Sequence, residues 1–170
     1  MPENRLLVRA ALLLALVVVF QSVPMLLPLP PFVLIFIIGS LVNATMFIAV
    51  KSVNLKTALI ISCVVPIIAF LQGKLPIVPF ILVVALGNSL YVILLNVLAN
   101  YNKYFMIVAA ALGKTLMLAI GTWLVLSIVI LPPPLAKAVS FAMSWPQMVT
   151  STIGGFLGLM LLQRLGLNKT

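Results

Sequence analysis

The sequence predicts an all-α integral membrane protein, a single domain of six transmembrane helices over residues 1–170 with both termini in the cytoplasm. Its composition is the first reason. Hydrophobic residues make up 65% of the chain and charged residues only 6%, whereas about 25% of the residues in a typical soluble domain are charged. So few charged side chains cannot cover a water-facing surface, and we therefore expect lipid to surround the chain.

The second reason is that prolines, glycines and charged residues divide the chain into six apolar segments, each close to the roughly 20 residues that cross a bilayer. We expect spanning helices at residues 6–23, 32–50, 55–72, 77–98, 103–131 and 145–163. Arg5 and Arg9 precede the apolar run ALLLALVVVF, as in a signal peptide, but no A-x-A cleavage pattern comes after it. We expect this helix to be retained.

The third reason is the distribution of the basic residues. If the N-terminus lies inside, the cytoplasmic ends of the segments carry Arg5, Arg9, Lys51, Lys56, Lys103, Arg164 and Lys169. The outer connections carry only Lys74 and Lys137, and Lys114 lies within a span. An excess of Lys and Arg on the cytoplasmic side is the usual orientation signal of membrane proteins. Both termini are therefore predicted to be cytoplasmic.

The same composition excludes several classes of function. The net charge of +9 comes from ten Lys and Arg residues against one acid, Glu3. The basic residues mostly stand singly at segment ends, which indicates topology signals and lipid contacts, not nucleic-acid binding. Without histidine, and with one acid, the chain lacks the parts of a zinc site or of carboxylate acid–base catalysis. Gly113-Lys114-Thr115 is no phosphate-binding loop, because Val108 stands where that loop has its first glycine. We expect no enzyme activity and no cofactor.

The connections on the two sides differ in chemistry. The cytoplasmic ones are short and polar, whereas the outer ones are long, apolar and rich in proline. We expect the outer connections to be ordered, non-helical or interfacial caps, which either cover a pocket or dip into the lipid interface. Ser144-Trp145-Pro146-Gln147 matches an S-x-x-Q capping box, and it predicts that the last helix begins at Trp145.

Lys114 is the main candidate for a functional residue. It lies eleven residues after Lys103, hence about 16 Å along the helix and close to the bilayer midplane. A charge at that depth costs at least about 2.5–3.5 kcal/mol, and the sequence offers no acid within the membrane to pair with it. The alternative is a lysine that snorkels to the interface or sits with water in a crevice.

Other polar side chains lie within the predicted spans or at their outer ends. Asn88 and Tyr91 share one face of a helix because they are three residues apart. The residues predicted to line a substrate pocket are Lys114, Asn88, Tyr91, Gln72, Trp145, Gln147 and Asn43. The alternative for each of them is a hydrogen bond to a neighbouring helix, which contributes about 0.6 kcal/mol.

Two pairs of small residues predict close helix contacts. Ala11 and Ala15 form an A-x-x-x-A pattern in the first segment, and Gly154 and Gly158 form a G-x-x-x-G pattern in the last. Small residues at this spacing let helix backbones approach each other. We expect internal packing at the glycine pair.

Three stretches together carry a family resemblance: RLLVRAALLLALVVVFQ, PIIAFLQGKLPIVPFILVVALGNSLYVIL and MSWPQMVTSTIGGFLG. With them, the chain resembles the substrate-binding S components of energy-coupling factor (ECF) vitamin transporters. The resemblance implies a six-helix bundle in the bacterial plasma membrane. It also implies an outward-facing pocket for a vitamin or cofactor precursor, roofed by the loops between helices 1–2, 3–4 and 5–6.

The resemblance further implies partners. Such proteins dock on a membrane scaffold (T) subunit that carries two cytoplasmic ATPase subunits, and Ala11 and Ala15 would meet that scaffold. Pocket residues vary with the substrate in this family, so the residues named above rest on the physical argument alone. A pocket with a lysine and no acid favours a neutral or anionic ligand over a cation. The alternative function is a non-transporting membrane scaffold resembling the cell-shape protein MreD, which has little need of a midplane lysine.

Overall fold

The computed structural model describes residues 3–26 and 29–166, and the regular structure in these ranges is entirely helical. The helices are α1 (Glu3–Leu26), α2 (Pro31–Ser52), α3 (Leu55–Leu71), α4 (Pro79–Val97), α5 (Lys103–Ile128), α6 (Pro133–Ala142) and α7 (Trp145–Arg164), with a 3₁₀ turn at Leu98–Asn100. This confirms the predicted all-α class. All six expected segments coincide with helices to within a few residues.

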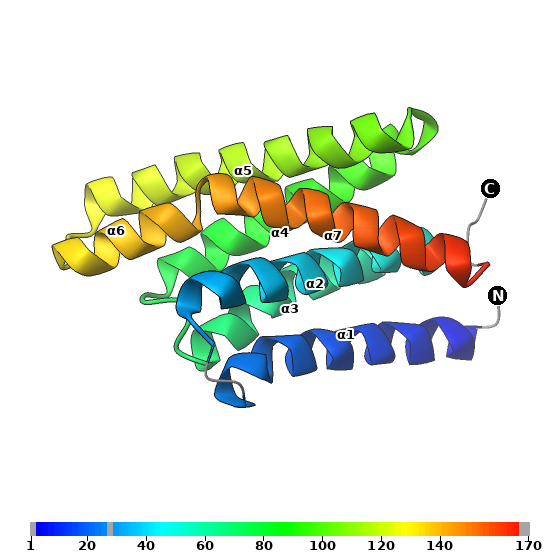
Figure 1. The fold of residues 1–170 in the computed structure, drawn as a ribbon, viewed down its shortest axis with the longest axis horizontal. Coiled ribbons are helices and arrows are strands. Elements are labelled where there is room, and N and C mark those ends of the chain that lie inside the picture. The colour runs from blue at the N-terminus through cyan, green and yellow to red at the C-terminus, as the bar shows by residue number, and fades with distance from the viewer. Residues whose placement is uncertain (1–2, 27–28, 167–170) are drawn as a thin grey trace.

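Four of the helices, α1, α2, α4 and α5, are long and apolar enough to cross a membrane. The helix α3 is apolar but has only 17 residues. The helix α7 has 20 residues and carries a polar run at Thr150–Thr152. The long helices lie roughly side by side, and the start of α1 and the end of α7 lie at the same end of the bundle (Figure 1).

We call the opposite end, where α6 lies, the α6 end (Figure 1). The helices that begin there have proline in their first turn, namely α2, α4, α6 and α7. Two of the helices that begin at the other end, α3 and α5, are capped by asparagine. Asn54 Oδ1 accepts a hydrogen bond from Thr57 N at 2.8 Å, and Asn102 Oδ1 accepts one from Tyr104 N at 2.9 Å. Both devices suit a first turn, because its N–H groups have no partner within the helix.

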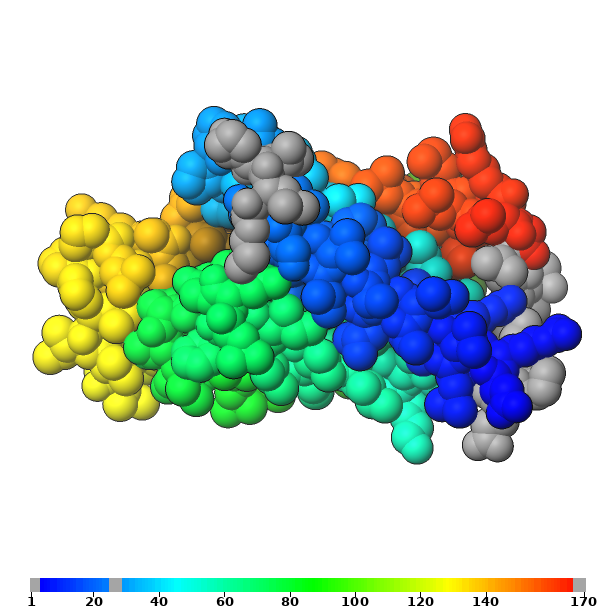
Figure 2. Space-filling view, turned by 90° about the horizontal axis from the view of Figure 1, so that it is seen from below, coloured from blue at the N-terminus to red at the C-terminus, as the bar shows by residue number. Residues whose placement is uncertain are grey.

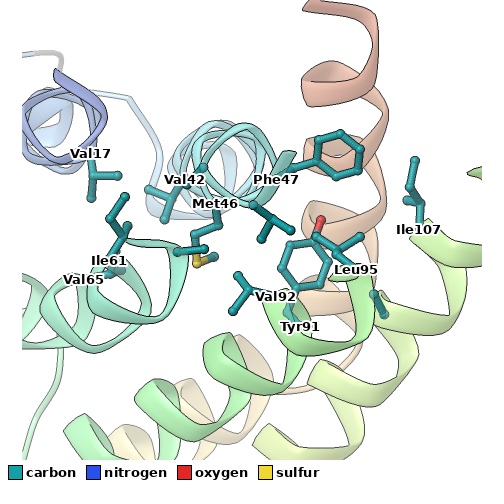
Figure 3. Packing of buried hydrophobic residues seen from close by; sticks show 14 of the residues in the cluster. Val17, Val42, Met46, Phe47, Ile61, Val65, Tyr91, Val92, Leu95 and Ile107 are labelled. Carbon is teal, nitrogen blue, oxygen red and sulfur yellow. The ribbon is translucent and has the colours of Figure 1, made fainter. Parts of the chain in front are cut away.

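Close packing of α7 on α2 organises the bundle. A Cβ atom added at Gly154 would lie 2.5 Å from the backbone oxygen of Ser40, and one added at Gly158 would lie 2.8 Å from the ring of Phe47. The Gly154-x-x-x-Gly158 pair therefore serves internal packing, as expected. The main apolar core lies around α2 and joins Val17 of α1 to residues of α3, α4, α5 and α7 (Figure 3).

Two expectations about the α6 end were wrong. Residues 133–142 form a helix, because the prolines occupy its first turn, where no N–H donor is needed. The helix α7 does begin at Trp145, but the capping box does not form. Ser144 Oγ donates backward to Phe141 O at 2.7 Å, and Gln147 Nε2 donates to Ala142 O at 2.9 Å.

Candidate functional site

Lys114 lies inside the bundle, with 3% of its side chain exposed. Its Nζ atom donates to Asn43 Oδ1 of α2 at 2.7 Å. The ring of Tyr91, on α4, faces the same atom with its centroid 5.6 Å away, within the range of a cation–π interaction. The side chain thus turns inward to polar partners instead of running along the outer face of α5 to the interface.

Two further hydrogen bonds connect these residues to α7. Asn43 Nδ2 donates to Thr150 Oγ1 at 3.5 Å, and Thr150 Oγ1 donates to Gln147 O at 3.2 Å. The hydroxyl of Tyr91 points towards α7 and donates to the backbone oxygen of Ser151 at 2.9 Å (Figure 3). Asn43, Tyr91, Lys114 and Thr150, from four different helices, form what we call the Lys114 cluster.

The side chains that the structure describes include no acid that could pair with the charge of this cluster. Glu3 is the only acidic residue in the sequence, and it belongs to α1, a helix that contributes no residue to the Lys114 cluster. Asn43 Oδ1 is the one hydrogen-bond acceptor that the described residues give to Nζ, although an ammonium has three N–H groups. A buried charge is stable only when it is paired and hydrogen-bonded, so the cluster can accept an added anion or carbonyl oxygen.

The predicted pocket residues divide into two groups. Lys114, Asn43 and Tyr91 meet in the Lys114 cluster, and Asn88 is buried one turn from Tyr91 on the side of the α6 end. Three others lie apart, each with a different local partner: Gln72, Trp145 and Gln147.

Trp145 is 52% exposed and packs against aromatic rings. Its ring centroid lies 5.8 Å from that of Phe36 and 5.7 Å from that of Phe141. This aromatic group joins the starts of α2 and α7 to α6. Gln147 is held by its bond to Ala142 O, described above, and reaches the Lys114 cluster only through its backbone oxygen.

Gln72 belongs to a second polar group that ties the α3–α4 connection to α1. Its Nε2 atom donates to Ser22 Oγ at 3.2 Å, Gln21 Nε2 donates to Val65 O at 3.2 Å, and Lys74 Nζ donates to Gln21 O. Partial burial lowers the pKa of the Lys74 ammonium. The Oε1 atoms of both glutamines are buried and accept no hydrogen bond from the described residues, although an amide oxygen can accept one.

Sequence reasoning missed Thr150, Ser151 and Thr122. All three side chains are buried, and the hydroxyls of Ser151 and Thr122 have no partner among the described residues. The polar run at residues 150–152 inside an apolar segment was a signal that could have found the first two. Thr122 lies eight residues after Lys114, and hence on the same face of α5.

A small apolar cluster lies between the Lys114 cluster and the α6 end. Its buried members, which we call the roof cluster, are Leu75, Phe80, Val83, Leu118, Val139 and Met143. Leu118 follows Lys114 by one helical turn on the same face of α5, so it connects the two clusters. Val139 and Met143 come from α6 and the bend after it, and Leu75 comes from the α3–α4 connection.

The Lys114 cluster brings an ammonium, an amide and an aromatic ring side by side. Among the described residues, no group of three or more His, Cys, Asp or Glu could hold a metal ion. Ammonium, amide and aromatic groups are what binding sites use to fix the orientation of an organic molecule. Comparison of the chain with protein-family models, curated proteins and solved structures finds no match.

Proposed function

We propose that this protein is the substrate-binding membrane subunit of an ECF-type importer. It captures a vitamin or cofactor precursor from outside, and separate ATPase subunits supply the energy for uptake. The observation that carries the proposal is the buried Lys114 ammonium, which contacts residues of α2 and α4 and receives no carboxylate partner from the residues that the structure describes. Burying a cation in that position costs free energy if the bundle is merely structural, whereas in a binding site the cation can pair with the ligand.

The arrangement at the α6 end supports the same reading. The roof cluster contains residues from the α3–α4 connection and from the α6 region, which are two of the three outer connections expected to cover a pocket. In the proposed topology α3 and α7 cross the bacterial plasma membrane together with the other four helices. This gives six spans, cytoplasmic termini and an α6 end that faces outward.

The surface of α1 supports the proposed docking on a scaffold subunit. Figure 2 shows α1 lying along the outside of the bundle. Ala11 and Ala15 are exposed on it, and the neighbouring exposed side chains include Leu7, Val8 and Leu12. An apolar face with small residues at i and i+4 suits close approach of another membrane helix. The same face would also suit the alternative, a non-transporting scaffold resembling MreD. Detection of a bound ligand therefore distinguishes the two functions.

Mass spectrometry of small molecules tests the proposal. The protein is purified in detergent from cells grown in complex medium, then denatured, and the released compounds are identified. The proposal predicts one vitamin-like compound at close to one molecule per chain. If repeated preparations release no compound, the import function is contradicted and the scaffold alternative is favoured.

A further inference from the structure

We propose that the ligand is a monocarboxylate with an apolar body, and that its carboxylate pairs with Lys114. This inference rests on the proposed function and narrows the class of substrate. The apolar body of the ligand would lie towards the α6 end, against side chains of the roof cluster. Three features of the site lead to this chemistry: its charge, its surplus of hydrogen-bond donors and the apolar surface beside it.

The single positive charge of the Lys114 cluster favours a ligand with one negative group. Lys114 is the only charged residue of the Lys114 cluster, and Glu3 is the only acidic residue of the chain. A single ammonium balances one carboxylate, whereas a phosphate ester would bring close to two negative charges into a buried site with one cation. A cationic ligand would add a second positive charge, and a neutral ligand would leave the ammonium unbalanced.

The hydrogen-bonding capacity of the site also favours an acceptor. Two N–H groups of Lys114 have no acceptor among the described residues, and the bond from Asn43 Nδ2 to Thr150 Oγ1 is long at 3.5 Å, so this amide is weakly held. The buried hydroxyls of Ser151, next to Thr150 on α7, and of Thr122, about two turns beyond Lys114 on α5, have no partner among the described residues. An ionised carboxylate offers two oxygens that only accept hydrogen bonds, which matches a site rich in donors.

The apolar body follows from the roof cluster. Leu118 lies one turn beyond Lys114 on the same face of α5, and it is followed towards the α6 end by Val83, Val139 and Met143. A ligand with its carboxylate at Lys114 would therefore meet apolar side chains at its other end. Lys114 is 3% exposed, so the ligand reaches it when the roof cluster opens. The helix α6 has only ten residues and packs against α5 and α7 near the α6 end, so it is the element that we expect to move.

The probe for the test is the water-soluble small-molecule fraction of complex growth medium. One half is left untreated, and the carboxyl groups of the other half are converted to methyl esters. Each half is incubated with purified protein from which any bound compound has first been removed by exhaustive washing in detergent. Unbound compounds are then washed away, and retained compounds are measured by mass spectrometry. The same is done with Lys114→Gln, which can still donate to Asn43 but has no charge. Lys103→Gln is the control, because it removes the same charge from an exposed position.

We expect the wild-type protein and Lys103→Gln to retain a carboxylic acid at least about tenfold more than its methyl ester, because only the acid forms the ion pair. Lys114→Gln should retain the two forms equally. Equal retention by the wild-type protein, or a retained compound without a carboxylate, would overturn this inference and leave the import function standing. If the wild-type protein retains no compound from either half, both this inference and the proposed import function are overturned. A carboxylate found only in the lipid phase of the denatured protein would support the ion pair and contradict the import of a soluble substrate.

Discussion

At the scale of single residues, the long basic side chains have two different roles. Lys51 Nζ donates to Leu95 O at 2.9 Å in the last turn of α4, and Arg9 Nη1 donates to Ser52 O at 3.4 Å at the end of α2. Carbonyl groups at the end of a helix lack intrahelical partners and carry the negative end of its dipole, so cations stabilise them. Lys114 differs from both, because it lies in the middle of a helix and its partner is a side chain.

The role of Lys51 can be tested by removing its charge. We expect Lys51→Met to lower the free energy of unfolding by about 1 kcal/mol, because the end of α4 loses its capping cation. Thermal denaturation of the detergent-purified protein would measure this change. Lys56→Met is the matched control, since Lys56 is exposed, and it should leave the midpoint almost unchanged. Equal midpoints for the two variants would remove the capping role.

The sequence could predict that Lys114, Asn43, Asn88 and Tyr91 face the interior of the bundle, because a polar side chain deep in an apolar helix is stable only where it finds polar partners. It could not show that Gln147 would bond to Ala142, since that bond exists only where α6 turns into α7. It also could not show that Gln72 would donate to Ser22, because Ser22 lies fifty residues away in the sequence, on α1. Which partner a polar side chain bonds depends on tertiary contacts, and the periodicity of the sequence carries no information about them.

At the scale of helices, the pair α2 and α7 brings the Lys114 cluster together. A Cβ atom added at Gly154 would lie 2.5 Å from Ser40 O and 2.6 Å from Asn43 Cβ, so the two backbones approach as closely as glycine allows. Gly39 lies in the same seam, where an added Cβ would be 2.9 Å from Thr150 Cγ2. The geometry of Asn43 and Thr150 therefore depends on this contact.

Gly154→Ala should push α7 away from α2. We expect it to destabilise the protein by about 1–3 kcal/mol, the usual cost of overpacking, and to weaken ligand binding. Gly113→Ala is a suitable control on α5. There the added Cβ would lie 2.4 Å from Leu94 Cδ1, the far end of a side chain that can turn away. Thermal denaturation of both variants measures the difference, and an equal loss of stability in the two would contradict the backbone-contact explanation.

Helix boundaries were largely predictable because proline, asparagine and charge mark them in the sequence. The starts at Pro31, Leu55, Pro79, Lys103 and Trp145 all lie within two residues of the expected positions. The helix α6 was missed because its prolines were interpreted as breakers, although proline fits the first turn of a helix. Proline in a sequence marks a boundary, but it does not say on which side of it a helix lies.

At the scale of the whole molecule, α1 provides the surface proposed for docking. We expect replacement of both Ala11 and Ala15 by leucine to abolish co-purification with the scaffold and ATPase subunits, because the larger side chains keep the helices apart. Ligand binding and the denaturation midpoint should not change, since both alanines are exposed. Ala119→Leu on α5 is the control, as it enlarges another exposed alanine. Unchanged co-purification of the double variant would contradict the docking role.

The proposed orientation can be measured with single cysteines. In a Cys63→Ser background, a membrane-impermeant thiol reagent added to intact cells should label Lys137→Cys on α6. It should leave Asn100→Cys unlabelled until the cells are permeabilised. Both positions are exposed, so access from the correct side is the only difference between them. Labelling of Asn100→Cys in intact cells would reverse the orientation and place the roof cluster on the cytoplasmic side.

The measurement that tests the central claim most directly is the dissociation constant of the compound released from the wild-type protein. It is determined by isothermal titration calorimetry in one detergent for the wild-type protein and for Lys114→Met. If Lys114 forms the floor of the binding site, Kd rises at least about tenfold in the variant, which corresponds to about 1.4 kcal/mol. Equal Kd values in a variant that folds normally would contradict the claim and leave Lys114 a structural residue.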